Sequence, residues 1–254
     1  MYMISVLVYE LDLRHRFEDA QRAMNGLMRD PRLNTSLACM FIGLMQGPAT
    51  VTICGDMVDT MAGEHLKNDE KAAVATYLRH IPEAMVPTFT GVIVACSISG
   101  ISISSFFVWM LPMALLTLLA IYLVYLRRVP RTVGETGHSK KECVRLLLRS
   151  LWSLLLAIAV IIVFSLPTWA VVTVVAAFIP LAYTMIPNGG AFLLALLMSV
   201  SFASSQLSPT HICTAIISDY FGVTFFATVK KLLPLFLLTV LIACGYYMLL
   251  TAVF

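Results

Sequence analysis

The chain has 254 residues, 59% of them hydrophobic and only 12% charged, with a formal net charge of +3. Soluble domains are about half apolar and about a quarter charged, so this composition excludes a water-soluble fold of this size. In a bilayer, only helices or closed barrels satisfy all their backbone hydrogen bonds. Barrel strands alternate polar and apolar residues, whereas this chain has long unbroken apolar runs. We therefore expect an all-α, polytopic transmembrane protein.

The first segment combines a charged helix with an interrupted apolar stretch. Residues 10–32 carry five basic and five acidic residues and have apolar residues at helical spacing, which predicts an amphipathic helix. Residues 33–55 are apolar but are interrupted at 46–50, where Pro48 removes a backbone donor and Gly47 permits unusual dihedrals. Each apolar leg is too short to cross a bilayer alone. We expect a re-entrant helical hairpin with its tip at 46–50; the alternative is one kinked span.

A polar stretch, two spans and a basic loop follow. Residues 56–83 are polar and net acidic, and we interpret Asp56 and Asp59 as solvated loop residues. Residues 84–126 contain no charge, which predicts two spans, at 84–102 and 106–126, joined by a tight turn. The stretch 127–149 has seven basic residues against two acidic ones. Because positive loops lie on the cytoplasmic side, we place it there.

The second half repeats this order. Asp219 is the single charge in residues 150–229. We expect a span at 146–166 and a second interrupted segment at 168–203, with its tip at 187–190. A broken span through Asp219 should then lead to a basic pair, Lys230 and Lys231, before a final span at 232–254.

These elements predict an inverted repeat. With both basic clusters inside, the first hairpin enters from the cytoplasm and the second from the outside. Hairpin, broken span and span thus occur twice in opposite orientation, which is typical of secondary transporters. We place the first repeat at 1–126, the basic cytoplasmic loop at 127–149 and the second repeat at 150–254.

Hairpin tips expose backbone groups that can bind ligands. Unpaired N–H groups can hold an anion, unpaired carbonyls can hold a cation, and small polar residues allow close approach. The alternative is a packing role at helix kinks. The candidate tip residues are Gln46, Gly47, Pro48, Thr50, Asn188, Gly189 and Gly190.

The sequence Ser208-Pro209-Thr210-His211 is the strongest single candidate site. Pro209 frees a carbonyl one turn back, and the hydroxyls of Ser208 and Thr210 could complete a sodium-like oxygen shell. His211 titrates near neutral pH and could relay protons. The alternative is a helix cap at the outer membrane face. Asp219 could serve a proton or cation, or lie nearer the interface.

Arg79, His80 and Glu83 lie where the polar stretch meets a span. We interpret them as interfacial anchors, with Arg79 paired to Glu83 at i,i+4; the alternative is that Arg79 binds a substrate anion. The six cysteines include no CxxC pair, so we interpret them as packing residues. We predict no metal site and no cofactor, apart from Na+ or H+ as a coupling ion.

Three segments carry a resemblance to a known family: FIGLMQGPA, ATYLRHIPEAMVPTFTGVIVA and LSPTHICTAIISDYFGV. They are similar to segments of the prokaryotic membrane family called domain of unknown function 401. That family is grouped with the ion-transporter superfamily of gluconate, citrate and dicarboxylate carriers. The resemblance implies two inverted repeats with re-entrant hairpins, and ligands bound near 46–50, 79–83 and 208–211. It also implies that the usual N-terminal helices of such carriers are lacking.

Together these features predict an ion-coupled secondary transporter of a small anionic organic solute in the inner (cytoplasmic) membrane. One alternative is a partner-dependent or non-transporting membrane subunit. Another is an intramembrane enzyme using His211 and Asp219, but no catalytic motif is present, so we expect no enzyme activity. The expected partners are the lipid bilayer, the solute, and a second copy or another chain; no nucleic acid is expected.

Overall fold

The computed structural model describes residues 30–44, 48–86, 89–131, 144–145, 182–184, 186, 189–208 and 211–253. Every regular element in these ranges is a helix, as the composition predicts. Two of them, α7 (Ile103–Val124) and α12 (Phe225–Val253), are long and apolar enough to cross a membrane. Most of the amphipathic helix expected at 10–32 lies outside the described residues. The span expected at 146–166 lies wholly outside them.

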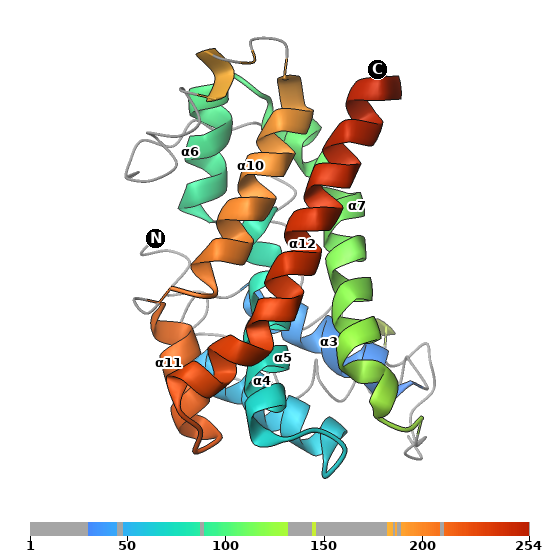
Figure 1. Cartoon of the computed structure of the whole chain (residues 1–254), viewed down its shortest axis with the longest axis vertical. Coiled ribbons are helices and arrows are strands. Elements are labelled where there is room, and N and C mark those ends of the chain that lie inside the picture. The colour runs from blue at the N-terminus through green and yellow to red at the C-terminus, as the bar shows by residue number, and fades with distance from the viewer. Residues whose placement is uncertain are drawn as a thin grey trace.

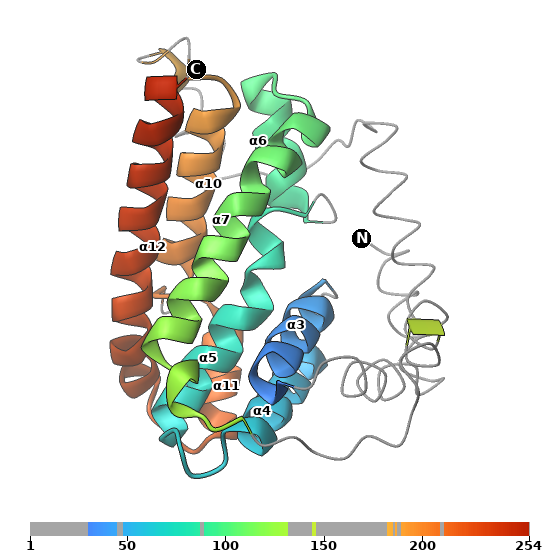
Figure 2. The same cartoon turned by 90° about the vertical axis from the view of Figure 1, so that its right-hand side faces the viewer.

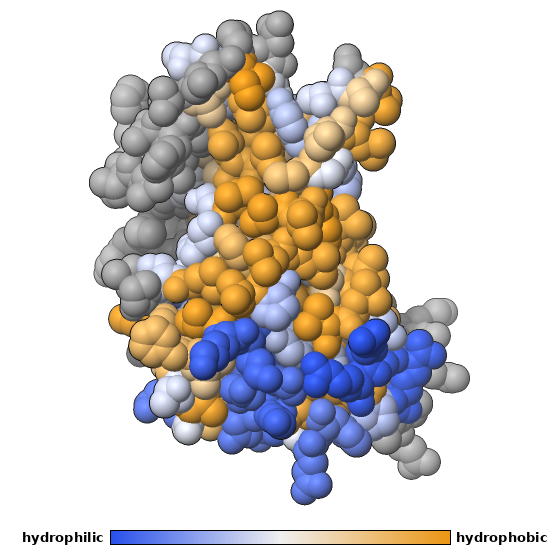
Figure 3. Space-filling model, in the orientation of Figure 1, coloured by the Kyte–Doolittle hydropathy of each residue, from blue (hydrophilic) through white to orange (hydrophobic). Residues whose placement is uncertain are grey.

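The helices fall into an upright group and a second group gathered at one end. α6 (Thr90–Ser99), α7, α10 (Gly190–Ser205) and α12 run along the long axis (Figures 1 and 2). The helices of the second group, α3 (Pro31–Gly43), α4 (Pro48–Ala62), α5 (Asn68–His80) and α11 (Ile212–Tyr220), gather toward the lower end. Hydrophilic residues also collect at this end, below a broad apolar surface (Figure 3). We call it the charged end.

α5 is the central helix of the charged end. It contacts α3, α4, α11 and α12, and every residue from Glu70 to His80 is buried. The backbone N–H of Lys67 donates to Glu70 Oε2 at 3.2 Å and so satisfies a free donor at the helix start. The interpretation of Asp56 and Asp59 as loop residues is wrong, because α4 continues to Ala62; α5 fills most of the rest of 56–83. Asp56 and Asp59 are exposed, but they lie on α4.

The segment 33–55 forms two helices rather than one kinked span. α3 begins at Pro31, capped by Asp30, and α4 begins at Pro48. The Cys39 thiol lies 3.9 Å from the carbonyl oxygen of Cys54, and the Cys54 thiol lies 3.7 Å from that of Cys39. This reciprocal contact shows that the chain turns back on itself between the two helices. Entry of this hairpin into a membrane stays a prediction.

Of the two spans expected between residues 84 and 126, the first differs from the helices found. Instead of a span at 84–102, the chain forms a short 3-10 helix, η1 (Pro82–Ala84), and then α6, which has only 10 residues. α7 agrees closely with the span expected at 106–126. Gly100, with a φ of 70°, ends α6, and the Ser102 hydroxyl caps α7 by accepting from the N–H of Ser105.

The end of the chain also differs from expectation. α11 has 9 residues and is too short to span a bilayer. α12 begins at Phe225, so Lys230 and Lys231 lie within this helix instead of in a loop before it. Between the two helices the chain turns at Gly222, whose φ is 63°. Residues 211–224 therefore form a short helix and a turn instead of part of a span.

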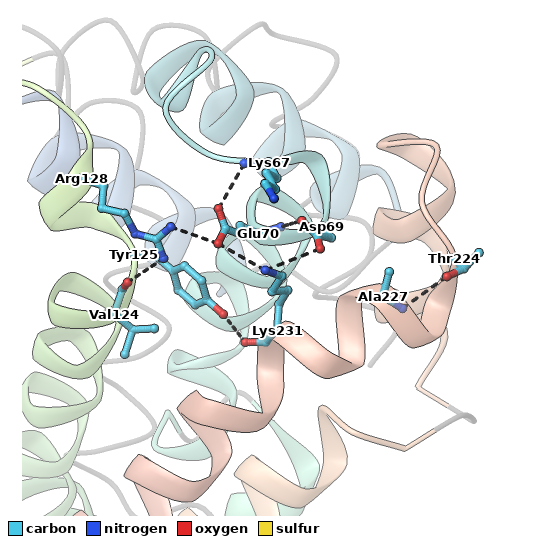
Figure 4. Close-up of polar contacts among 9 residues, drawn as sticks. All are labelled: Lys67, Asp69, Glu70, Val124, Tyr125, Arg128, Thr224, Ala227 and Lys231. Carbon is cyan, nitrogen blue, oxygen red and sulfur yellow. Dashed lines mark hydrogen bonds and ion pairs between the residues drawn. The ribbon is translucent and has the colours of Figure 1, made fainter.

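Ion pairs around Glu70 join three elements at the charged end (Figure 4). Glu70 Oε1 lies 3.0 Å from Nη1 of Arg128, which follows α7, and 3.4 Å from Nζ of Lys231 on α12. The Tyr125 hydroxyl donates to the carbonyl oxygen of Lys231. Burial alone would raise the pKa of Glu70. The Lys67 N–H and the charges of Arg128 and Lys231 outweigh burial and lower that pKa.

Candidate functional site

The last turn of α5 carries two adjacent polar residues that are almost completely buried. Arg79 is 6% exposed and His80 is 0% exposed. Pro82 follows and ends the helix, because its ring cannot continue the backbone hydrogen bonds. α3 comes so close that a Cβ atom at Gly43 would lie 1.9 Å from the carbonyl oxygen of Arg79. The interpretation of Arg79 and His80 as interfacial anchors is therefore wrong, since both lie inside the protein.

The guanidinium of Arg79 is held by neutral groups. Nε donates to Thr50 Oγ1 on α4 at 3.0 Å. Nη1 lies 2.8 Å from Nε2 of His80 and 3.4 Å from Sγ of Cys213 on α11. Among the described residues, no carboxylate lies within ion-pair distance of Arg79. Arginine stays protonated in proteins, so a positive charge is buried here that forms no ion pair with any described carboxylate, although Glu83 lies nearby.

The contacts of His80 assign its protons. Nδ1 lies 2.5 Å from the carbonyl oxygen of Thr76, which can only accept, so Nδ1 carries a hydrogen. The neutral ring then has a lone pair on Nε2, which accepts from Arg79. Nε2 of His211 lies 2.9 Å from the same atom and must be the donor in that contact. Glu83 Oε2 is 3.6 Å from His80 Nε2, and the predicted Arg79–Glu83 ion pair is not formed.

The two histidines belong to two interrupted helical segments. The first runs through α5, η1 and α6, and His80 is the last residue of α5. The second runs through α10 and α11, and His211 caps the start of α11. The first segment runs away from the charged end and the second runs back toward it (Figure 1). The contact between the rings, with centroids 4.6 Å apart, marks where the two interruptions meet.

Three of the sequence-predicted segments meet at this contact. Thr50 comes from the first hairpin, Arg79, His80 and Glu83 from the end of α5 and η1, and His211 from the second interruption. Ser208 lies in that interruption, and its carbonyl accepts from the N–H of His211 at 3.0 Å. We call Thr50, Arg79, His80, His211 and Cys213 the Arg79 cluster.

Other predicted residues lie elsewhere. Gly189 and Gly190 are at the opposite end of α10, a helix of 16 residues and thus about 24 Å long, so the structure does not bring them to the Arg79 cluster. Asp219 is exposed two helical turns beyond His211. The remaining predicted positions fall outside the described residues: Gln46, Gly47, Asn188, Pro209, Thr210 and the side chain of Pro48.

Sequence reasoning missed two members of the site. Cys213 was interpreted only as a packing residue, although it lies two positions after His211. Thr76 was not singled out, although it precedes His80 by one helical turn and its carbonyl fixes the imidazole. Reading 68–80 as a buried helix would have placed both Thr76 and His80 on one face.

A metal ion is disfavoured at this site, although three possible ligands converge. The ligand atoms of His80, His211 and Cys213 lie within 4.8 Å of one another. Nη1 of Arg79 contacts two of them, the His80 nitrogen and the Cys213 sulfur. The guanidinium already places a positive charge where a cation would bind, and the two charges would repel each other.

A family comparison agrees with the resemblance seen in the sequence. Residues 3–179 match the family described as Protein of unknown function (DUF401). The chain belongs to this family. The DUF401 match includes Thr50, Arg79, His80 and Glu83, whereas His211 and Cys213 lie beyond it. No curated protein and no solved structure matches the chain.

Proposed function

We propose that this DUF401 protein is a secondary active transporter of the cytoplasmic membrane. It would move a small organic anion by alternating access and couple that movement to Na+ or H+. The observation that carries the proposal is the buried guanidinium of Arg79, which has only neutral partners among the described residues.

A membrane location is supported by the apolar surface. In their most apolar windows, only 28% of α7 and 22% of α12 is buried within the protein, so neither is the core helix of a soluble fold. Leu115 on α7 is 67% exposed and Leu241 on α12 is 69% exposed. Hydrophobic side chains cover the middle of the face in Figure 3. Lipid would remove this surface from water.

An anionic solute would supply the charge that Arg79 lacks. A buried arginine without an ion-paired carboxylate costs up to several kcal/mol, and such a cost is tolerated where a ligand provides a direct countercharge. The guanidinium can bind a carboxylate through two parallel hydrogen bonds, which gives geometric selectivity as well as energy. The site thus favours a solute with a carboxylate or a comparable planar anionic group.

Alternating access is supported by the two interrupted segments. They run in opposite directions and meet at the histidines, as expected for inverted repeats. Interrupted helices expose backbone groups at depth only where these line a cavity or a binding site. The hairpin of α3 and α4 adds Thr50 to the same place.

Ligand binding provides the first test. The purified chain is screened by thermal unfolding with gluconate, citrate and succinate, each with and without sodium. A ligand at a hundredfold excess over its Kd stabilises the folded state by about 2.7 kcal/mol. We expect one acid class to raise the Tm of the wild type and of Arg127→Gln, an exposed arginine, but not of Arg79→Gln.

Uptake into proteoliposomes provides the second test. We expect the acid that stabilises the protein to accumulate against its gradient, and Arg79→Gln to abolish this accumulation while Arg127→Gln retains it. Equal uptake by Arg79→Gln and the wild type would refute the site. Uptake that requires a second, co-reconstituted membrane protein would support a partner-dependent subunit instead.

A further inference from the structure

One nitrogen atom in the Arg79 cluster has several polar neighbours but only one lone pair with which to accept a hydrogen bond. Nε2 of His80 lies 2.8 Å from Nη1 of Arg79, 2.9 Å from Nε2 of His211 and 3.6 Å from Oε2 of Glu83. Because Nδ1 is engaged by the Thr76 carbonyl, the only lone pair of the neutral ring is on Nε2. A proton on this atom would face the N–H groups of Arg79. Donation by Arg79 and protonation of Nε2 therefore exclude each other.

We propose that the coupled ion is a proton, which the His80–His211 pair takes up when the solute anion draws the Arg79 guanidinium away from Nε2 of His80. This inference rests on the function proposed above, since it requires an anion that binds Arg79. It narrows the coupled ion from Na+ or H+ to a proton, and it names Nε2 of His80 as the atom that takes this proton up.

The proton can reach this atom through His211. His211 is half-buried, whereas His80 is completely buried, so the first ring is the accessible one. A hydronium ion gives its proton to Nδ1 of His211, which forms a new N–H bond there and leaves a water molecule. The N–H bond at Nε2 of His211 breaks, and its proton forms a bond with Nε2 of His80. His211 ends neutral with its hydrogen on Nδ1, and His80 becomes an imidazolium with both nitrogens protonated.

The surroundings stabilise the imidazolium form of His80 once the Arg79 guanidinium has turned to the solute. Four charged or titratable described groups face His80: Arg79 on α5, Glu83 on η1, and His211 and Cys213 on α11. Glu83 brings a carboxylate close to the new imidazolium. The C-terminal end of α5, where His80 lies, carries the negative end of the helix dipole and favours a cation.

The atoms that converge here favour a proton over sodium. Hard cations prefer oxygen ligands, whereas the cluster presents two imidazole nitrogens and a thiol. Its one side-chain hydroxyl, Thr50 Oγ1, already accepts from Arg79 Nε. One proton and one anionic charge would enter together, and neither would bind well without the other.

The replacement of Arg79 by a proton at Nε2 of His80 can be tested without knowing the solute. The full chain is labelled with 15N-histidine, and its five histidines are assigned by single replacement. From about pH 6 to about pH 8, where histidines normally titrate, we expect His80 to be neutral with its hydrogen on Nδ1 and His211 to carry its hydrogen on Nε2. An imidazolium at His80 near neutral pH, or a hydrogen on its Nε2, would overturn the proposal. Apart from the replacements used to assign the signals, this measurement is made on the unmodified chain.

A substitution then tests whether donation by Arg79 prevents protonation of Nε2 of His80. Arg79→Met should raise the proton affinity of the pair by at least about tenfold, which is one pH unit in the midpoint. The exposed Arg127→Met should leave the midpoint unchanged. An unchanged midpoint in Arg79→Met would refute the competition between Arg79 and the proton.

Transport decides the identity of the ion. In proteoliposomes we expect an inward proton gradient to drive accumulation of the acid found in the binding screen, and a sodium gradient to have no effect. Any uptake that remains in His80→Gln should no longer respond to the pH gradient. Sodium-driven accumulation would overturn the proton assignment but leave the proposed function standing. No movement of any acid would refute the proposed function. The histidine measurements would still decide whether Arg79 and a proton compete for Nε2 of His80.

Discussion

Gly43→Ala should loosen the contact that holds the Arg79 cluster together. The added methyl carbon would lie 1.9 Å from the carbonyl oxygen and 2.8 Å from the carbonyl carbon of Arg79. Ordinary contacts begin at 3.4 Å, so α3 and α5 must separate by roughly 1.5 Å. Both partners are backbone in helices, so no flexible side chain can give way. Overpacking of this kind costs about 1–3 kcal/mol, and the better helix propensity of alanine returns about 0.5–1 kcal/mol.

The net loss of up to about 2.5 kcal/mol should lower the Tm by up to about 10 °C for a chain of this size. Thermal unfolding of the purified protein measures it. Gly245→Ala is the matched control, because Gly245 lies inside α12 and no heavy atom would come within 4 Å of its Cβ atom. That variant should keep or slightly raise the Tm. If Gly43→Ala were as stable as Gly245→Ala, the close approach of α3 to α5 would be refuted.

Three further predictions concern residues outside this contact. The lowered pKa of Glu70 means that its carboxylate stabilises the fold above about pH 4.5 and that this contribution is lost as the pH falls below that value; the Tm difference between wild type and Glu70→Gln should therefore shrink in acid. Tyr77→Phe leaves the Thr239 hydroxyl, 2.5 Å from the Tyr77 oxygen, without that partner and should cost about 1–3 kcal/mol, read as a lower Tm. Asp219→Asn should leave uptake unchanged, because this exposed carboxylate lies outside the Arg79 cluster; a loss of uptake would return it to the site.

Strong local signals in the sequence predicted part of this fold. The charge-free run before Arg127 gave a span at 106–126, and α7 occupies Ile103–Val124. Gly47 and Pro48 predicted the interruption between α3 and α4, because both residues act on their own backbone. Such features need no partner elsewhere in the chain, so they can be recognised without a structure.

α5 was missed because its burial depends on other helices. Its mean hydropathy is low, and its first turn carries Asp69 and Glu70. Its interior is rich in alanine, which lets α3, α4, α11 and α12 come close enough to cover a polar sequence on all sides. Arg79 and His80 then looked like residues at a membrane surface. Their partners Thr50 and His211 are 29 and 131 residues away in the chain, a separation that no periodicity can bridge.

The two interruptions also explain how a polar cluster can be buried here. A continuous α5 would bond its last carbonyls to the next turn, and Pro82 prevents this. A continuous helix from α10 into α11 would carry His211 along the same axis, whereas the break places it at the start of a separate helix, against His80. Each break alone would leave unpaired backbone and a buried polar ring. Together they give His80 Nε2 a donor on each side, from Arg79 and from His211, which is the arrangement from which we propose proton uptake.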